Sequence, residues 1–323
     1  MTAPHGRGLL HLATAIDQEE AHDASVHVEL ARLAEGGKFD FVTLGDTFTR
    51  PGLDALAVLA QVAPATTRIG LVPAVVGTHG DPFHVQAAVT TLDRASRGRA
   101  GWCIDVSTAE GVTRRSGRRH TGPAGSWGDA FPVHDTLREP RHGAGAVHGN
   151  GVGHPVRVVD ATDRQARATA ARYADVALVH GVNPAQVGTI RAELHAGALT
   201  HGREPDELCV LAALTVDLGD GERAAERGHG GGGPRQSARG PLYRGGPVDL
   251  AELMAGWHET GAADGFHLIP VEPRRDLERL VNGTIALLQH RGLFRTFYPG
   301  STLREHLGLA RPADRRRVAG GMS

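Results

Sequence analysis

Polar side chains capable of ligand binding or proton transfer stand directly after several apolar runs of this chain. The residues are Asp46 and Thr47 after the second run, Gly77, Thr78 and His79 after the third, Ser107 after the fourth, and Thr162 after the fifth. Carboxylate and hydroxyl groups can bind the polar parts of a ligand, and imidazole can also transfer a proton near neutral pH. If the apolar runs are parallel strands, these side chains converge on one polar site.

A structural role remains open for individual members of this set. Asp46 and Asp163 each precede a predicted helix and can serve as its N-cap. A single Asp or Thr at the end of a strand fits either role equally well, so the prediction of a site depends on the whole set.

Apolar runs and amphipathic helical patterns alternate along the chain. The predicted strands lie at 9–17, 39–46, 69–76, 99–107, 155–162, 175–181, 208–218 and 264–271. The predicted helices lie at 24–36, 53–63, 82–96, 163–174, 184–201, 248–261 and 275–290. Eight strands with crossover helices favour an α/β fold of the closed (β/α)8, or TIM barrel, type over an open sheet.

Two glycine-rich stretches interrupt this alternation. Residues 108–153 and 219–246 show no sustained helical period and are expected to be irregular excursions after the fourth and seventh strands. Both would lie at the carboxyl end of the barrel, where the active sites of such barrels are found. A length of 323 residues fits a single domain spanning 1–323.

The fourth strand places polar residues on one face. Alternation puts Cys103, Asp105 and Ser107 on the side opposite Trp102, so the polar set should face the barrel interior. A buried Asp105 needs a partner, and the interpretation we favour is structural pairing with His11 or His267; contact with a ligand is the alternative.

Composition and charge exclude several classes of function. A net charge of −1 without long basic runs argues against nucleic acid and membrane partners and favours a small-molecule substrate. Cys103 and Cys209 lie far apart in apolar runs, which suits reduced thiols in a cytoplasmic protein. No apolar run approaches the length of a membrane span, and no histidine spacing indicates a metal site.

Several motifs together resemble one family. They are DFVTLGDT, TTRIGLVP, THGDPFHVQAAVTTLDRASRGRAGW, DGFHLIP and, near the C-terminus, RGLFRTFYPGSTLREHLGLARPADR. The chain resembles the bacterial luciferase-like flavin-dependent monooxygenases, in the branch that contains nitrilotriacetate monooxygenase component A. The resemblance implies a (β/α)8 barrel that uses reduced FMN and oxygen to oxidise a small organic substrate.

The resemblance also implies partners and residue roles. Reduced FMN would come from a separate flavin reductase, and the protein would form a homo-oligomer. Asp46 and Thr78 match flavin-contacting positions, with Gly77 and His79 in the same turn; Ser107 and Thr162 complete the expected cofactor contacts, and His79 is the expected catalytic residue.

Two departures from the family pattern leave other functions open. Cys103 stands where much of the branch has an asparagine. Asp163 stands where many relatives have a serine that binds the FMN phosphate, and the charge of Asp163 would repel a phosphate unless its side chain turns away to cap its helix. One alternative is an F420-dependent hydride-transfer oxidoreductase with the same fold. Another is a non-catalytic paralogue that keeps the barrel for flavin binding or as a structural module.

Overall fold

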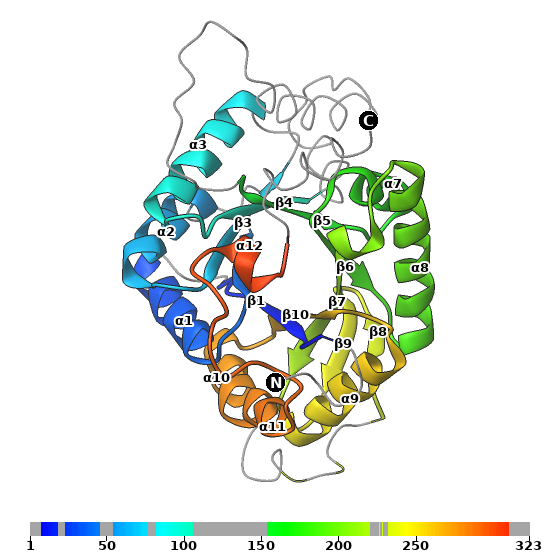
Figure 1. Ribbon diagram of the computed structural model, residues 1–323. Coiled ribbons are helices and arrows are strands. Elements are labelled where there is room, and N and C mark those ends of the chain that lie inside the picture. Colours follow the sequence, from blue (N-terminus) through cyan, green and yellow to red (C-terminus); the bar gives the residue numbers. More distant parts are fainter. Residues whose placement is uncertain are drawn as a thin grey trace, which may run out of the picture.

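Eight parallel strands close into a ring. The computed structural model describes residues 8–18, 23–45, 54–76, 82–105, 154–219, 226, 228 and 232–309. The ring strands are β1 (His11–Ala15), β2 (Phe41–Gly45), β3 (Gly70–Val76), β4 (Gly101–Asp105), β5 (Val156–Asp160), β6 (Val176–His180), β7 (Cys209–Asp217) and β10 (Gly265–Pro270). Each pairs with the next, and β10 pairs with both β7 and β1, so the predicted closed barrel is confirmed (Figure 1).

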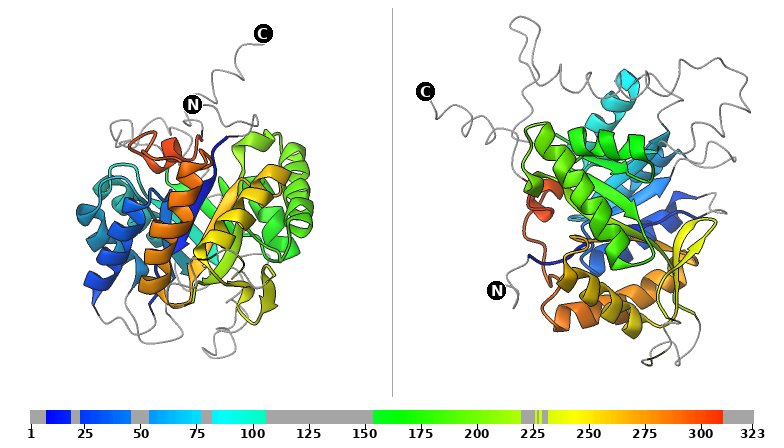
Figure 2. Two further views of the ribbon diagram at one scale, coloured as in Figure 1. Left: turned by 90° about the horizontal axis from the view of Figure 1, so that it is seen from below. Right: turned by 90° about the vertical axis from the view of Figure 1, so that its right-hand side faces the viewer.

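Helices surround the ring (Figures 1 and 2). They are α1 (Ala24–Gly36), α2 (Ala55–Val62), α3 (Pro82–Ala95), α7 (Arg164–Tyr173), α8 (Pro184–Thr200), α9 (Pro247–Thr260), α10 (Pro273–Arg279) and α11 (Ala286–His290). Four of these helices follow an N-cap residue whose side chain accepts a hydrogen bond from a backbone N–H of the first turn: Asp23, Asp54, Asp163 and Asn183. Such caps satisfy backbone N–H groups that the helix itself leaves unpaired.

Strand alternation separates two apolar regions. On β6, Val176 and Leu178 pack inside the barrel, while Ala177 and Val179 pack against the surrounding helices. β4 follows the same rule, because Cys103 lies in the interior cluster and Trp102 in the outer one, as the sequence predicts. The side chain of Asp105 lies outside the described part of the structure.

The segment after α11 closes the amino-terminal end of the barrel. Its short helix α12 (Leu303–His306) lies over the opening of the ring in Figure 1, and Leu303, Leu307 and Leu309 belong to the interior cluster. Two buried ion pairs hold this segment: Arg295 lies 2.8 Å from Asp40, and Arg304 lies 3.4 Å from Asp175. Asp40 immediately precedes β2 and Asp175 immediately precedes β6, so both ion pairs lie at the amino-terminal end of the barrel.

Two details differ from the sequence prediction. The stretch 219–246, expected to be irregular, contains an antiparallel hairpin of β8 (Arg235–Ser237) and β9 (Gly240–Arg244), and β9 adds alongside the end of β7. The helix expected at 275–290 begins at Pro273 and is interrupted by a π-helical turn, Leu280–Ile285. The excursion 108–153 lies outside the described residues. In the portion of the chain that the structure describes, no helix has the length and apolar character needed to cross a membrane.

Candidate functional site

Four polar residues form a layer inside the barrel near the carboxyl ends of its strands. We call them the polar layer: Thr43, Asp160, His180 and His267. Thr43, Asp160 and His180 each stand two residues beyond an interior residue of the same strand, and His267 pairs in register with the interior residues Ala13 and Ala213, so all four side chains are directed inward. The interior therefore changes from apolar, at the end closed by α12, to polar at the carboxyl end, which is the catalytic end of (β/α)8 enzymes.

Thr43 and His267 bridge across the strand between them. Thr43 Oγ1 lies 2.8 Å from His267 Nε2, and each residue is 5 % exposed. β1 separates their strands, and its paired residues Ala13 and Ala15 have side chains small enough to leave room for the bridge.

Burial determines the protonation state of His267. It lowers the pKa of His267 to about 4; the charge of Asp160 acts in the opposite direction and that of His180 in the same direction, both more weakly. The imidazole is therefore neutral at pH 7 and carries a single N–H. Nδ1 is buried and has no hydrogen-bond partner among the residues that the structure describes.

Asp160 and His180 form the other half of the polar layer. Asp160 Oδ1 lies 3.2 Å from His180 Nε2 and accepts a hydrogen bond from the Thr162 hydroxyl at 2.5 Å. Burial acts to raise the pKa of Asp160, but the contacts with His180 and Thr162 outweigh it and lower the pKa. Asp160 is thus a carboxylate at neutral pH, with its side chain 29 % exposed toward the mouth of the barrel.

The β8–β9 hairpin covers His180 at the rim. Gly240 begins β9 with a φ of +95°, and a Cβ built there would lie 3.1 Å from His180 Nδ1. Glycine is therefore required both for the backbone conformation and for the close approach to the imidazole. The hairpin limits the space in which His180 can move.

Most of the residues predicted from the sequence lie outside the described residues: Asp46, Gly77, Thr78, His79 and Ser107. Of the predicted set only Thr162 is described, and its hydroxyl donates to Asp160. Asp163 accepts from the backbone N–H of Ala166 at 2.7 Å and so caps α7, which is the structural role the sequence left open.

The sequence prediction did not select the polar layer as a site. His267 was considered only as a partner for Asp105, whose side chain lies outside the described structure, so that pairing stays a prediction. Of the two histidines considered, His11 lies 3.3 Å from Asp40, and His267 bonds to Thr43. Strand parity, applied to every ring strand as it was to the fourth, is the signal that would have found the layer.

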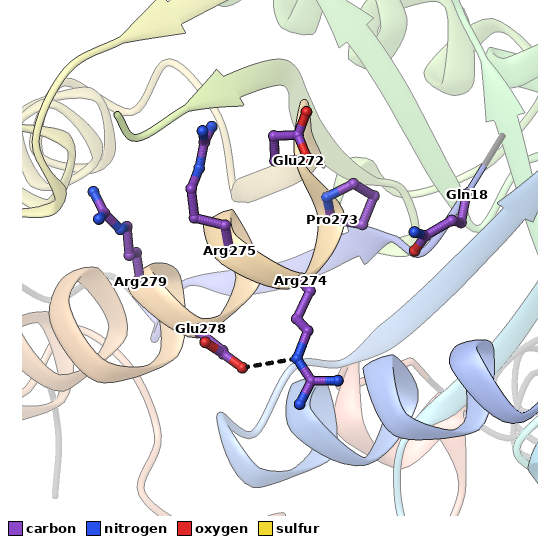
Figure 3. A pocket seen from close by; sticks show the side chains of 7 residues that line it. All are labelled: Gln18, Glu272, Pro273, Arg274, Arg275, Glu278 and Arg279. Atoms are coloured by element: carbon purple, nitrogen blue, oxygen red, sulfur yellow. Dashed lines mark hydrogen bonds and ion pairs between the residues drawn. The ribbon is translucent and has the colours of Figure 1, made fainter. Parts of the chain in front are cut away.

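A separate hollow lies outside the polar layer, between the end of β1 and α10 (Figure 3). Its volume is about 420 Å³, and it is lined by Gln18, Glu272, Pro273, Arg274, Arg275, Glu278 and Arg279. Arg274 pairs with Glu278 and Glu29, and Arg275 pairs with Asp217 and Asp276. Because carboxylates already compensate these cations, we do not assign an anion site there.

The polar layer is not arranged as a metal centre. Within the described ranges, no group of three or more His, Cys, Asp or Glu side chains is placed to hold a metal ion. The layer instead offers hydrogen-bond donors and acceptors at the floor of a barrel mouth, which suits an organic ligand with a polar edge.

Comparison with known proteins defines the class to which this fold and site belong. Residues 7–289 match the model of the luciferase-like monooxygenases, and the chain belongs to that family. The predicted family and class of enzyme are therefore confirmed.

Two characterised relatives show which members of the family this chain is similar to. The chain is 25 % identical to N-acetyl-S-(2-succino)cysteine monooxygenase of Bacillus subtilis, covering 94 % of this chain and 95 % of the relative. It is 24 % identical to nitrilotriacetate monooxygenase component A of Aminobacter aminovorans, covering 91 % and 92 %, which supports the predicted branch.

Solved structures show the same fold. EDTA monooxygenase from Chelativorans sp. BNC1 superposes with a TM-score of 0.77 at 18 % identity, covering 94 % of this chain and 99 % of that one. The F420-dependent tetrahydromethanopterin reductase from Methanopyrus kandleri gives a lower TM-score of 0.64 at 16 % identity, covering 87 % of this chain and 99 % of that one.

Proposed function

We propose that this protein is a flavin-dependent monooxygenase that uses reduced FMN and oxygen to oxidise a small organic substrate. The observation that carries the proposal is the polar layer at the carboxyl end of a closed barrel in a chain of this family. Names of the relatives support it, because they are monooxygenases acting on small organic molecules.

The residues of the polar layer fit a flavin. The isoalloxazine ring has a polar pyrimidine edge and an apolar dimethylbenzene edge, and it needs hydrogen-bonding groups on one side only. The orphaned Nδ1 of His267 and the part-exposed Asp160 supply such groups at the floor of the mouth. Bound flavin would supply the reaction with oxygen; the chain's own residues would bind the ring, orient it and exclude water.

The phosphate of FMN needs an anchor away from this floor. The Thr162 hydroxyl is engaged with Asp160, and the Asp163 carboxylate occupies the first turn of α7, so both would have to change partner to leave room for a phosphate there. We retain Asp46, Gly77, Thr78, Ser107 and Thr162 as proposed cofactor contacts and His79 as the proposed catalytic residue.

Reduced FMN would be delivered by a separate flavin reductase, and we propose a homo-oligomer, as the family resemblance implies. The relative named component A is one part of a multi-component system, which supports a separate reductase.

Flavin titration and oxygen uptake test the proposal. The purified protein should bind reduced FMN under anaerobic conditions and, with a flavin reductase and NAD(P)H present, should change the rate of oxygen consumption. Binding of F420 but not FMN would favour the hydride-transfer alternative. Absence of binding to either would favour the non-catalytic paralogue and exclude the proposal.

A further inference from the structure

We propose that His267 is a flavin-positioning residue whose Nδ1–H donates a hydrogen bond to an acceptor atom on the pyrimidine edge of the bound isoalloxazine ring. This inference rests on the proposed function. It assigns a specific contact to a residue on the last ring strand, β10, which lies far in sequence from the residues predicted to bind the cofactor.

The position of His267 distinguishes it from other buried histidines. His27, His195 and His306 also have a buried ring nitrogen without a hydrogen-bond partner in the described structure, but they lie on α1, α8 and α12 and not on a ring strand. His267 faces the interior at the boundary between the apolar half of the barrel and its carboxyl end. A ligand that enters the mouth and rests on the polar layer therefore meets His267.

The bond to Thr43 indicates which proton His267 carries. If Nε2 carried it, the Thr43 hydroxyl would accept, and two groups would remain to be satisfied: the hydroxyl proton and the lone pair of Nδ1. If the Thr43 hydroxyl donates to Nε2, only the Nδ1–H is left over. One acceptor atom on a ligand then satisfies the pair, which makes the Nδ1–H form the simpler arrangement.

The flavin ring offers such acceptors. Its C2 and C4 carbonyl oxygens and its N1 nitrogen lie along the pyrimidine edge, and a neutral imidazole can donate to any of them. Asp160 and His180 act electrostatically on His267, and all three residues belong to the polar layer on which a ligand in the mouth would rest. Thr43 fixes the imidazole plane from the opposite nitrogen.

Two substitutions at His267 test the contact. His267→Leu removes both ring nitrogens, and we expect it to weaken binding of FMN about tenfold, the effect of one lost hydrogen bond with an unsatisfied ligand acceptor. His267→Asn can place an amide N–H near the position of Nδ1, and it should restore affinity to within about threefold of the wild type. Because the contact is to the ring, riboflavin should lose affinity by the same factor as FMN.

His27→Leu is the matched control, since it replaces a buried histidine outside the barrel. It should leave flavin affinity unchanged, and thermal melts of all variants would show whether folding is affected. For wild-type protein with 15N-labelled histidine, NMR should show the Nδ1–H signal of His267 shift and exchange more slowly when FMN binds. This measurement needs no variant and stands even if His267→Leu fails to fold.

The outcomes separate the two proposals. If the wild type binds neither oxidised nor reduced FMN, the proposed function fails and the inference fails with it. If the wild type binds FMN but His267→Leu binds it equally well, or the Nδ1–H signal is unchanged by FMN, the inference is overturned and the proposed function stands. A lowered melting temperature with unchanged affinity would assign His267 to the core alone.

Discussion

Removing the guanidinium of Arg304 should destabilise the barrel without affecting its carboxyl end. Arg304 is 9 % exposed and pairs at 3.4 Å with Asp175, which is 1 % exposed and also pairs with Arg157 at 3.2 Å. Arg304→Met keeps an apolar chain in place while the charge is lost. Because Arg157 still compensates Asp175, the cost should fall below the range of about 3–5 kcal/mol for an uncompensated buried charge. We expect about 2 kcal/mol at pH 7.

The effect should depend on pH with a defined sign. Burial acts to raise the pKa of Asp175, but Arg157 and Arg304 hold it well below its ordinary value. A carboxylate with a lowered folded pKa adds stability above its unfolded pKa, about 3.9, and loses it as the pH falls toward the folded value. Loss of Arg304 raises that folded pKa, so the stability difference between wild type and variant should shrink as the pH falls from about 5 to about 2.

Urea unfolding followed by circular dichroism measures this difference across the pH range. Arg274→Met is the matched control, because Arg274 is 70 % exposed and its partner Glu29 is 62 % exposed, so solvent screens the pair and the loss of stability should be much smaller than for Arg304→Met. Neither variant should change FMN affinity. Equal losses for the two variants, or a loss at Arg304 that does not vary with pH, would refute the reasoning.

Two further substitutions probe the rim and the outer layer. Gly240→Ala should lower the free energy of unfolding by about 1–3 kcal/mol, because φ is +95° and the new Cβ would press on His180. Urea unfolding and FMN titration should both respond to this substitution. Unchanged values in both assays would contradict the placement of the hairpin. Burial raises the pKa of Asp93 to about 6, so the folded protein binds more protons than the unfolded chain between about pH 4 and 6, and stability falls as the pH rises through that window. Asp93→Asn should remove this dependence, and an unaltered pH profile of unfolding would count against it.

Local patterns predicted the ring strands and most helices, and the reason is physical. A strand covered on both faces is an apolar run, as at Ile69 to Val76, and its crossover helix repeats apolar residues with a different period. The β8–β9 hairpin was not predicted because its strands are only three and five residues long and lie beside glycine-rich sequence. They are held by pairing with each other and by the pairing of β9 with β7, which no local pattern indicates.

The site was harder to predict because its contacts join distant residues. Thr43 and His267 are 224 positions apart, and nothing near either residue in the sequence indicates the other. Asp160 and His180 end strands predicted correctly, but recognition of their role required knowing which face of each strand turns inward and that the ring closes. The cap at Asp163 shows the converse, since a local signal was enough to state both possible roles.

The carboxylates at the two ends of the barrel are compensated differently, and the difference bears on where function lies. At the amino end, Asp40 and Asp175 are both compensated by arginines, as expected of groups retained for stability. At the carboxyl end, His267 keeps an unpartnered nitrogen, and Asp160 is left partly open to the mouth. His306 at the amino end also has a buried Nδ1 without a partner in the described structure, so an unpartnered nitrogen does not by itself indicate a ligand. The carboxyl end differs because its unpartnered nitrogen lies in the same polar layer as a carboxylate that remains partly exposed, a combination that suits a ligand with a polar edge. Variants at the amino end should therefore change stability alone, whereas variants in the polar layer should change ligand affinity.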